Sequence, residues 1–371
     1  MLFQIYGDRA LTQLFGWVLV FCGLVLMNEI ARRTKIGGLA VLVAVPAVLT
    51  VYFIVIQVAA HGGAEWALTN QTYVYMGGWF HYAKLYAADC GCIGFMMIKY
   101  GWGIGKKHWF KAFPFVIVAI NILIAVASDT ESAIKGLSAY AETGSHWWYS
   151  NENVWLYGGW WNILNAIAGV LNILCMTGWW GVYSSKDKKD MLWPDMTVWF
   201  IVAYDIWNFE YTYLNLPIHS WYCGVALLLA PTFANAFWNK GGWIQNRANT
   251  LAIWCMFAQV LPNFQERSNF AVVSSVYGDI YAWNGYRVAY DAEEFVQVAE
   301  DGSVLNLQTA AYDAMANPVP QGVIAILAVA ANVFCLTMII KRSIEMGKNP
   351  YSNDVWAGTK DYEEAMAKVD A

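Results

Sequence analysis

Residues 38–60 read GLAVLVAVPAVLTVYFIVIQVAA, a run of 23 residues without a charged side chain. At a rise of about 1.5 Å per residue, an α-helix of this length crosses the roughly 30 Å hydrocarbon core of a bilayer. Buried helices of soluble proteins typically show apolar stretches of only about 10–14 residues. The run therefore predicts a transmembrane helix, and comparable runs recur along most of the chain.

The composition is typical of a chain solvated by lipid. Apolar and aromatic residues make up 58% of the 371 residues, 21 of them tryptophan, and charged residues make up 13%, about half the share found in soluble domains. The 22 basic residues do not outnumber the 27 acidic ones, which argues against a nucleic-acid partner. The expected partners are the lipid bilayer and a small solute or ion, and the sequence leaves a homo-oligomer open.

Nine stretches are apolar enough and long enough to span a membrane. They are residues 11–31, 38–60, 77–100, 111–128, 159–183, 194–214, 219–238, 244–262 and 320–340. Helices satisfy their own backbone hydrogen bonds, so a polytopic chain of this kind is expected to be helical throughout. The sequence therefore predicts an all-α polytopic membrane protein with about nine transmembrane helices.

Positive charge is distributed unevenly about these spans. If the spans alternate in direction, 17 of the 22 Lys and Arg residues fall on one side, with Lys240 and Arg247 counted in the connection between the seventh and eighth spans. The positive-inside rule then places the N-terminus outside and the C-terminus in the cytoplasm. No basic segment followed by a small-residue cleavage site precedes the first span, so no signal peptide is expected.

The spans divide the chain into four parts. Residues 1–262 form a membrane domain of eight spans, 263–319 an external acidic loop or cap, 320–341 the ninth span and 342–371 a cytoplasmic tail. The acidic residues of the loop are Asp291, Glu293, Glu294, Glu300, Asp301 and Asp313. Residues 129–158 are expected on the outer leaflet, because tryptophan favours the headgroup level.

Motifs of cofactor and nucleophile chemistry are missing from the sequence. It contains no phosphate-binding loop, zinc-protease helix, nucleophile elbow or haem-attachment motif. The seven cysteines all fall within predicted spans, where cysteine behaves as a small apolar residue. No cofactor and no metal are therefore expected.

Ionisable side chains within the spans indicate where function lies, since each costs roughly 2.5–3.5 kcal/mol on insertion scales. The candidates in span 194–214 are Tyr204, Asp205, Trp207, Asn208 and Glu210, and those in span 77–100 are Lys84 and Asp89. Buried carboxylates beside a lysine are typical of structural ion pairs or of a proton or cation path. The aromatic members either stack on a ligand or fill helix interfaces.

Amides supply the remaining candidates. Asn162 and Asn165 lie on one face of span 159–183, and Gln259 lies toward the outer end of span 244–262. In lipid such side chains face other helices, where they hydrogen-bond across the interface. Helix packing is the favoured interpretation of the asparagine stripe, with site lining as the alternative.

Three motifs carry a resemblance to a known family: WWNILN at 160–165, SKDKKDM at 185–191 and AYDIWNF at 203–209. The chain resembles a family of uncharacterised multi-pass membrane proteins from anaerobic, often gut-associated bacteria, known as a domain of unknown function. The resemblance covers most of residues 10–275 and the last helix, with 276–319 as an unmatched insertion. It implies the bacterial cytoplasmic membrane as the location and brings no activity or cofactor.

Three functional hypotheses follow. The leading one is a transporter or permease for a small solute or ion, with a midplane site of the buried carboxylates, amides and aromatics named above. The second is an integral-membrane enzyme acting on a lipid or other hydrophobic substrate, with Asp205, Glu210 or His219 as acid–base groups near the outer leaflet. The third is a non-catalytic scaffold whose polar residues specify helix packing only.

Overall fold

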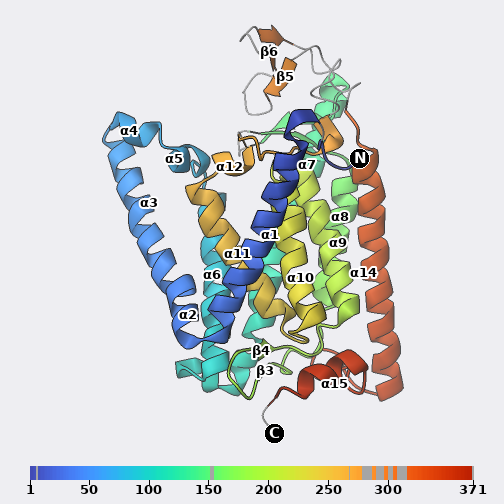
Figure 1. The fold of residues 1–371 in the computed structure, drawn as a ribbon. Coiled ribbons are helices and arrows are strands. Elements are labelled where there is room, and N and C mark those ends of the chain that lie inside the picture. Colours follow the sequence, from blue (N-terminus) through green and yellow to red (C-terminus); the bar gives the residue numbers. More distant parts are fainter. Residues whose placement is uncertain are drawn as a thin grey trace.

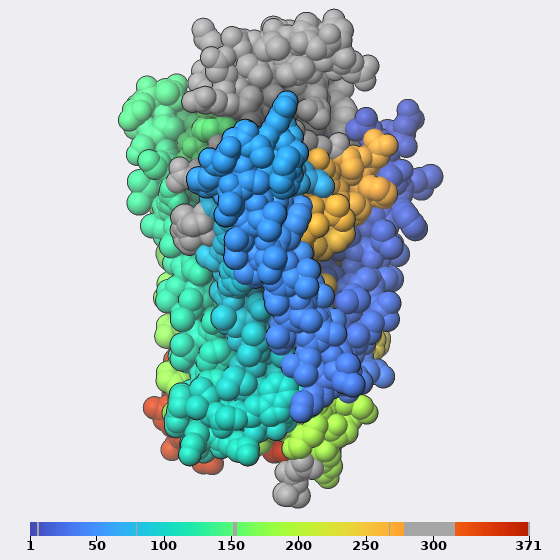
Figure 2. Space-filling view, turned by 90° about the vertical axis from the view of Figure 1, so that its left-hand side faces the viewer, coloured from blue at the N-terminus to red at the C-terminus, as the bar shows by residue number. Residues whose placement is uncertain are grey.

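The computed structural model describes residues 1–5, 7–150, 154–266, 268–277 and 316–369, together with three short strands between 286 and 306. Within these ranges the protein is mostly helical, and its helices run roughly parallel to one long axis (Figure 1). We call the end of the bundle at α2 (Lys35–Leu39) and α15 (Lys360–Met366) the lower end, and the end at α4 (Glu65–Leu68) and α12 (Asn263–Glu266) the upper end, as Figure 1 is oriented; Figure 2 keeps the same vertical axis.

The long helices are α1 (Ala10–Arg33), α3 (Val45–His61), α6 (Trp79–Tyr100), α7 (Phe113–Thr143), α8 (Trp160–Leu174), α9 (Val198–Asn215), α10 (Leu227–Phe237), α11 (Trp243–Val260) and α14 (Val319–Met346). Short helices are α2 (Lys35–Leu39), α4 (Glu65–Leu68), α5 (Gln71–Tyr75), α12 (Asn263–Glu266) and α15 (Lys360–Met366), and π-helical turns η2 (Ala40–Ala44) and η5 (Trp221–Ala226) precede α3 and α10.

The strands are short and antiparallel. They form the pairs β1 (Trp147–Tyr149) with β2 (Trp155–Tyr157) and β3 (Tyr183–Ser184) with β4 (Met191–Leu192), and a sheet of β5 (Tyr286–Ala289), β6 (Val296–Ala299) and β7 (Val304–Asn306). The acidic residues expected in the external cap lie outside the described residues.

Each of the nine expected spans contains a helix, but two boundaries differ from expectation. Helix α7 continues to Thr143, so Asp129 lies inside the bundle instead of in an interfacial segment. Helix α8 ends at Leu174 instead of continuing to 183. The indole of Trp193 donates to the carbonyls of Thr177 and Gly178 just beyond α8, and Gly178 adopts a positive φ of 59°. With these contacts the chain leaves the helix, and residues 175–197 form a layer at the lower end of the bundle, which we call the lower-end layer.

Four helical segments among the described residues are long and apolar enough to cross a membrane: Gly7–Arg33, Lys35–His61, His108–Thr143 and Val319–Met346. They expose many large apolar side chains, such as Leu11, Val58, Ile120 and Ile326. An apolar outer surface of this kind is typical of a protein that faces lipid. We conclude that the chain is a membrane protein.

The inner helices are more polar because other helices cover them. Helix α11 is buried over most of its length, including Gln245, Asn246 and Asn249. The amide of Asn28 on α1 donates to Asn246 Oδ1 (3.0 Å), and Asn249 donates back to Asn28 Oδ1 (3.0 Å). Amides that pair across helix interfaces in this way are common in membrane bundles. They lower the mean hydropathy of α11 without exposing polar groups to lipid.

The C-terminal tail packs against the lower-end layer. The carboxylate of Asp195 accepts hydrogen bonds from Thr177 Oγ1 (2.6 Å) and from the backbone N–H groups of Val355 (3.1 Å) and Trp356 (3.0 Å). Asp361 on α15 pairs with Lys240, which precedes α11 (3.3 Å). The tail is therefore attached both to the layer before α9 and to the start of α11.

Backbone contact between α7 and the turn before α8 predicts a sharp sensitivity to side-chain size. A Cβ atom at Gly136 would overlap the backbone of Gly158, which cannot rotate away as a side chain could. We expect Gly136→Ala to lower the free energy of unfolding by about 1–3 kcal/mol, measured by thermal unfolding in detergent. Gly23→Ala on α1 is the matched control, since a Cβ there meets nothing within 4 Å. Equal stabilities of the two variants would contradict this packing.

Titration of Asp195 predicts a pH dependence of stability. Burial raises the pKa of this carboxyl to about 7, against about 3.9 in an unfolded chain. Between these values the folded protein binds a proton that the unfolded chain does not, so the stabilisation is present at low pH and lost as pH rises through 7.

Between pH 5 and pH 8 the free energy of unfolding of the wild type should therefore fall relative to that of Asp195→Asn, by up to about 1.4 kcal/mol per pH unit. Chemical unfolding at each pH measures this difference. Glu364→Gln, at an exposed position of the same tail, should follow the wild type. An Asp195→Asn variant whose stability parallels the wild type at every pH would overturn the assignment.

Candidate functional site

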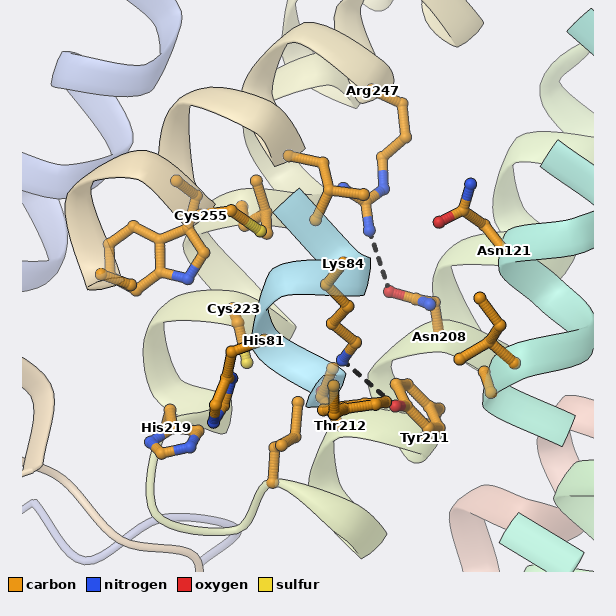
Figure 3. Close-up of a pocket in the computed structure, with 18 of the residues that line it drawn as sticks. His81, Lys84, Asn121, Asn208, Tyr211, Thr212, His219, Cys223, Arg247 and Cys255 are labelled. Atoms are coloured by element: carbon orange, nitrogen blue, oxygen red, sulfur yellow. Dashed lines mark hydrogen bonds between the residues drawn. The ribbon is translucent and has the colours of Figure 1, made fainter. Parts of the chain in front are cut away.

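An internal cavity of about 100 Å³ lies between α6, α7, α9 and α11, with His219 and η5 closing one side. Its polar lining includes Tyr75, His81, Lys84, Asn121, Tyr204, Asn208, Tyr211, Thr212, His219, Arg247, Gln259 and Gln265. Figure 3 shows Lys84, Arg247, Asn208 and Tyr211 converging from three different helices. Of the long helices, α1, α3, α8 and α14 contribute no residue to this lining.

Lys84 projects from α6 into the cavity wall. Its Nζ atom donates to Tyr211 Oη (3.2 Å) and lies 4.4 Å from the ring centroid of Phe80 and 5.0 Å from that of Tyr211. Aromatic faces attract a cation but do not neutralise its charge. Among the residues that the structure describes, no carboxylate lies within ion-pair distance of this amine.

Arg247 reaches the cavity from α11 and is 7% exposed. Its Nη2 donates to Asn208 Oδ1 (3.2 Å), and the guanidinium lies 5.8 Å from the ring centroid of Tyr204. Nε and Nη1 are buried without a hydrogen-bond partner in the described part of the chain. A guanidinium cannot lose its charge at physiological pH. The cavity therefore contains a permanent cation with unused donors.

Two histidines lie on the upper side of the cavity. The His81 ring stacks on Tyr75 at a centroid distance of 4.1 Å. The backbone carbonyl of His81 accepts a hydrogen bond from Gln259 Nε2 (2.7 Å). His219 Nδ1 lies 3.6 Å from Glu266 Oε1. These contacts order the upper wall, and the pair His219–Glu266 places an acid next to the cavity at that end.

The structure separates the expected site residues into two groups. Five of them line the cavity: Lys84, Tyr204, Trp207, Asn208 and Gln259. The remaining five are Asp89, Asn162, Asn165, Asp205 and Glu210, which do not line it. Asp205 accepts from Thr232 Oγ1 (2.7 Å) and lies near α10. The cavity lining therefore contains cations and amides where the sequence favoured carboxylates.

Sequence reasoning missed Arg247 and Asp129. Arg247 falls inside the expected span 244–262 but is counted there with the loop charges. A lone arginine within an apolar window is the signal that identifies it. Asp129 follows directly after the expected span 111–128, and α7 carries it into the interior. No helical pattern distinguishes it from an interfacial acid.

The cavity is chemically suited to an anion. Asp205 lies within electrostatic reach of Arg247, but neither Arg247 nor Lys84 forms an ion pair within the described residues. Cations without an ion-pair partner are costly to bury, and a bound negative charge would offset that cost. Lysine, arginine and tyrosine supply hydrogen-bond donors, and Trp254 and Leu251 supply apolar walls. No group of three or more His, Cys, Asp or Glu side chains gathers as a metal site within the residues that the structure describes.

Comparison with known proteins gives one match. Residues 7–368 match the Family of unknown function (DUF5692), and the chain belongs to it. No curated protein and no solved structure matches. The resemblance to a family of unknown function is thus confirmed, and the match also spans residues 276–319, which were expected to be an unmatched insertion. That the family consists of membrane proteins of gut bacteria stays a prediction.

Proposed function

We propose that this member of the DUF5692 family binds a small anion in the cavity between α6, α7, α9 and α11 and carries it across a membrane. The observation that supports this most directly is the guanidinium of Arg247, which lies buried with Nε and Nη1 unpartnered. Lys84 adds a second cation to the same cavity. An arginine with unused donors is the group that proteins use to hold carboxylates and inorganic oxyanions.

The size of the cavity limits the ligand. An apolar cavity of about 150 Å³ holds benzene, so about 100 Å³ suits an anion of roughly four or five non-hydrogen atoms. Short carboxylates and inorganic oxyanions have this size. Larger anions, nucleotides among them, would require the helices to move apart.

The proposal of transport rests on the position of the cavity within a bundle of membrane helices. We infer nine spans with the N-terminus outside and the C-terminus in the cytoplasm of a bacterial cell. Contacts at the lower end support this orientation: Lys99 Nζ donates to the carbonyl of Arg32 (2.9 Å), and Lys368 Nζ to that of Lys240 (3.1 Å). Basic residues from separate connections thus share one end, as the positive-inside rule expects of a cytoplasmic face.

Anion binding by the purified protein tests the proposal. We expect one or more of formate, acetate, nitrate, phosphate and sulfate to raise the unfolding temperature of the detergent-solubilised protein, because a ligand of the folded state stabilises it. In isothermal titration, Arg247→Gln and Lys84→Gln should each weaken the binding of that anion at least tenfold, about 1.4 kcal/mol.

Lys135→Gln is the matched control, since it removes an exposed lysine of α7 and should leave the affinity unchanged. Arg247→Lys retains the charge and should bind more tightly than Arg247→Gln. If none of the five anions binds the wild type, or if Lys135→Gln weakens binding as much as Arg247→Gln, the cavity is not an anion site. Uptake of the binding anion into proteoliposomes then tests transport itself.

A further inference from the structure

A second polar cluster lies around Asp129, which follows the cavity-lining Ala125 by four residues on α7. This aspartate is fully buried and accepts hydrogen bonds from the Nδ2 atoms of Asn215 (2.7 Å), Asn165 (2.8 Å) and Asn162 (3.2 Å). Ser132 Oγ donates in turn to Asn215 Oδ1 (2.5 Å). Three amide donors from α8 and α9 favour the ionised form of this carboxyl relative to that of a buried carboxyl without donors.

Glu210 has the opposite environment. It is fully buried, it lies within electrostatic reach of Asp129, and neither of its carboxyl oxygens has a hydrogen-bond partner among the described residues. The Oδ1 atom of Asn165, which is fully buried too, also lacks one. Two ionised carboxylates cannot lie together in an apolar interior without compensation. One of the pair must be neutral, and the one without donors is Glu210.

Among the described residues of α7, α8 and α14, no cation faces the cluster and could take this role. Helix α8 contains no charged residue, and α14 contains none before Lys341. On α7, Glu131 and Lys135 are exposed and face away. Tyr213, on α9 itself, is a further titratable group near Glu210. A proton is therefore the counterion that the described surroundings of Glu210 leave available.

Hydrogen bonds connect this cluster with the anion cavity. Asn215 Nδ2, which binds Asp129, also donates to the carbonyl of Tyr211 (3.2 Å), and Tyr211 Oη accepts from Lys84. Trp207 Nε1 donates to the carbonyl of Asn165 (3.1 Å). Trp207 and Tyr211 both line the cavity. Helix α9 thus contributes Trp207 and Tyr211 to the cavity and Glu210 and Asn215 to the cluster around Asp129.

We propose that Glu210 holds a single proton beside the ionised Asp129, and that this proton travels with the anion of the cavity. The proton site stands on the surroundings of Glu210 alone, whereas its coupling to an anion rests on the function proposed above. One proton and one monovalent anion form a neutral pair, so their joint passage moves no net charge through the apolar interior.

Infrared spectroscopy tests the proton site without any substrate. The spectrum of the wild type at pH 7 minus that of Glu210→Gln should contain the C=O stretching band of a protonated carboxylic acid. A difference spectrum that contains only carboxylate bands would show that Glu210 is ionised and would overturn the proposal. Asp205→Asn, which removes another acid of α9, should retain the band.

Asp129→Asn covers the case in which Glu210→Gln does not fold. This variant keeps Glu210 but removes the neighbouring charge, so the Glu210 band should persist at a shifted frequency. If that spectrum contains no carboxylic-acid band, the proposal is wrong. Stabilisation of the wild type by sodium chloride relative to choline chloride, together with an absent band, would assign the cluster to a metal cation instead.

Coupling is tested by the pH dependence of anion affinity. The affinity of the wild type should fall at least tenfold over the alkaline range in which the Glu210 band disappears, whereas Glu210→Gln, a permanent mimic of the protonated form, should bind with an affinity that does not change over that range. Equal pH dependence in both proteins would overturn the coupling. A wild type that binds no anion but shows the band would refute the anion cavity and leave the proton site standing.

Discussion

Each polar side chain inside this bundle needs a partner, because lipid and apolar side chains offer none. The architecture follows from that requirement. Helices α1, α3, α7 and α14 present apolar side chains outward, and they enclose α9 and α11, whose amides pair with one another or with the outer helices. Asn249 on α11, for example, donates to Asn28 Oδ1 on α1 (3.0 Å). Other buried side chains, among them Asp205 and Gln321, also have polar atoms without a partner in the described part of the chain. Arg247 and Glu210 are the ionisable groups with two such atoms each, and an ionisable group is the most costly to leave unpartnered.

The positions of the helices could be read from the sequence because lipid imposes a simple length and polarity rule on each span. The ends of α7 and α8 could not. Asp129 ends an apolar window in the sequence, yet α7 continues through it because Asn162, Asn165 and Asn215 satisfy the carboxylate. These partners lie between 33 and 86 residues away along the chain. A local pattern contains no information about such distant compensation.

The same limit applies to the site. The sequence identified Lys84, Asn208 and Trp207, which do line the cavity, because polar groups in apolar windows are rare. It grouped them with Asp205 and Glu210, which lie on α9 together with Trp207 and Asn208. Successive residues of a helix, however, point in directions about 100° apart. Helix α9 therefore divides its polar residues between two neighbourhoods of opposite charge. Only the packing of α6, α8 and α11 against it decides which residue belongs to which.

Close contact between Gly136 and Gly158 joins α7 to the start of α8. The asparagines that hold Asp129 lie on α8 and at the end of α9, so two of its three donors belong to the element to which α7 is fastened. Helix α7 also lines the cavity through Asn121 and Ala125. If the cavity widens because α7 is displaced, α8 should move together with α7. Asp129, Asn162 and Asn165 would slide together past a stationary Glu210. The close contact between Gly136 and Gly158 would in this way convert the entry of a solute into a change in the distance between Asp129 and Glu210.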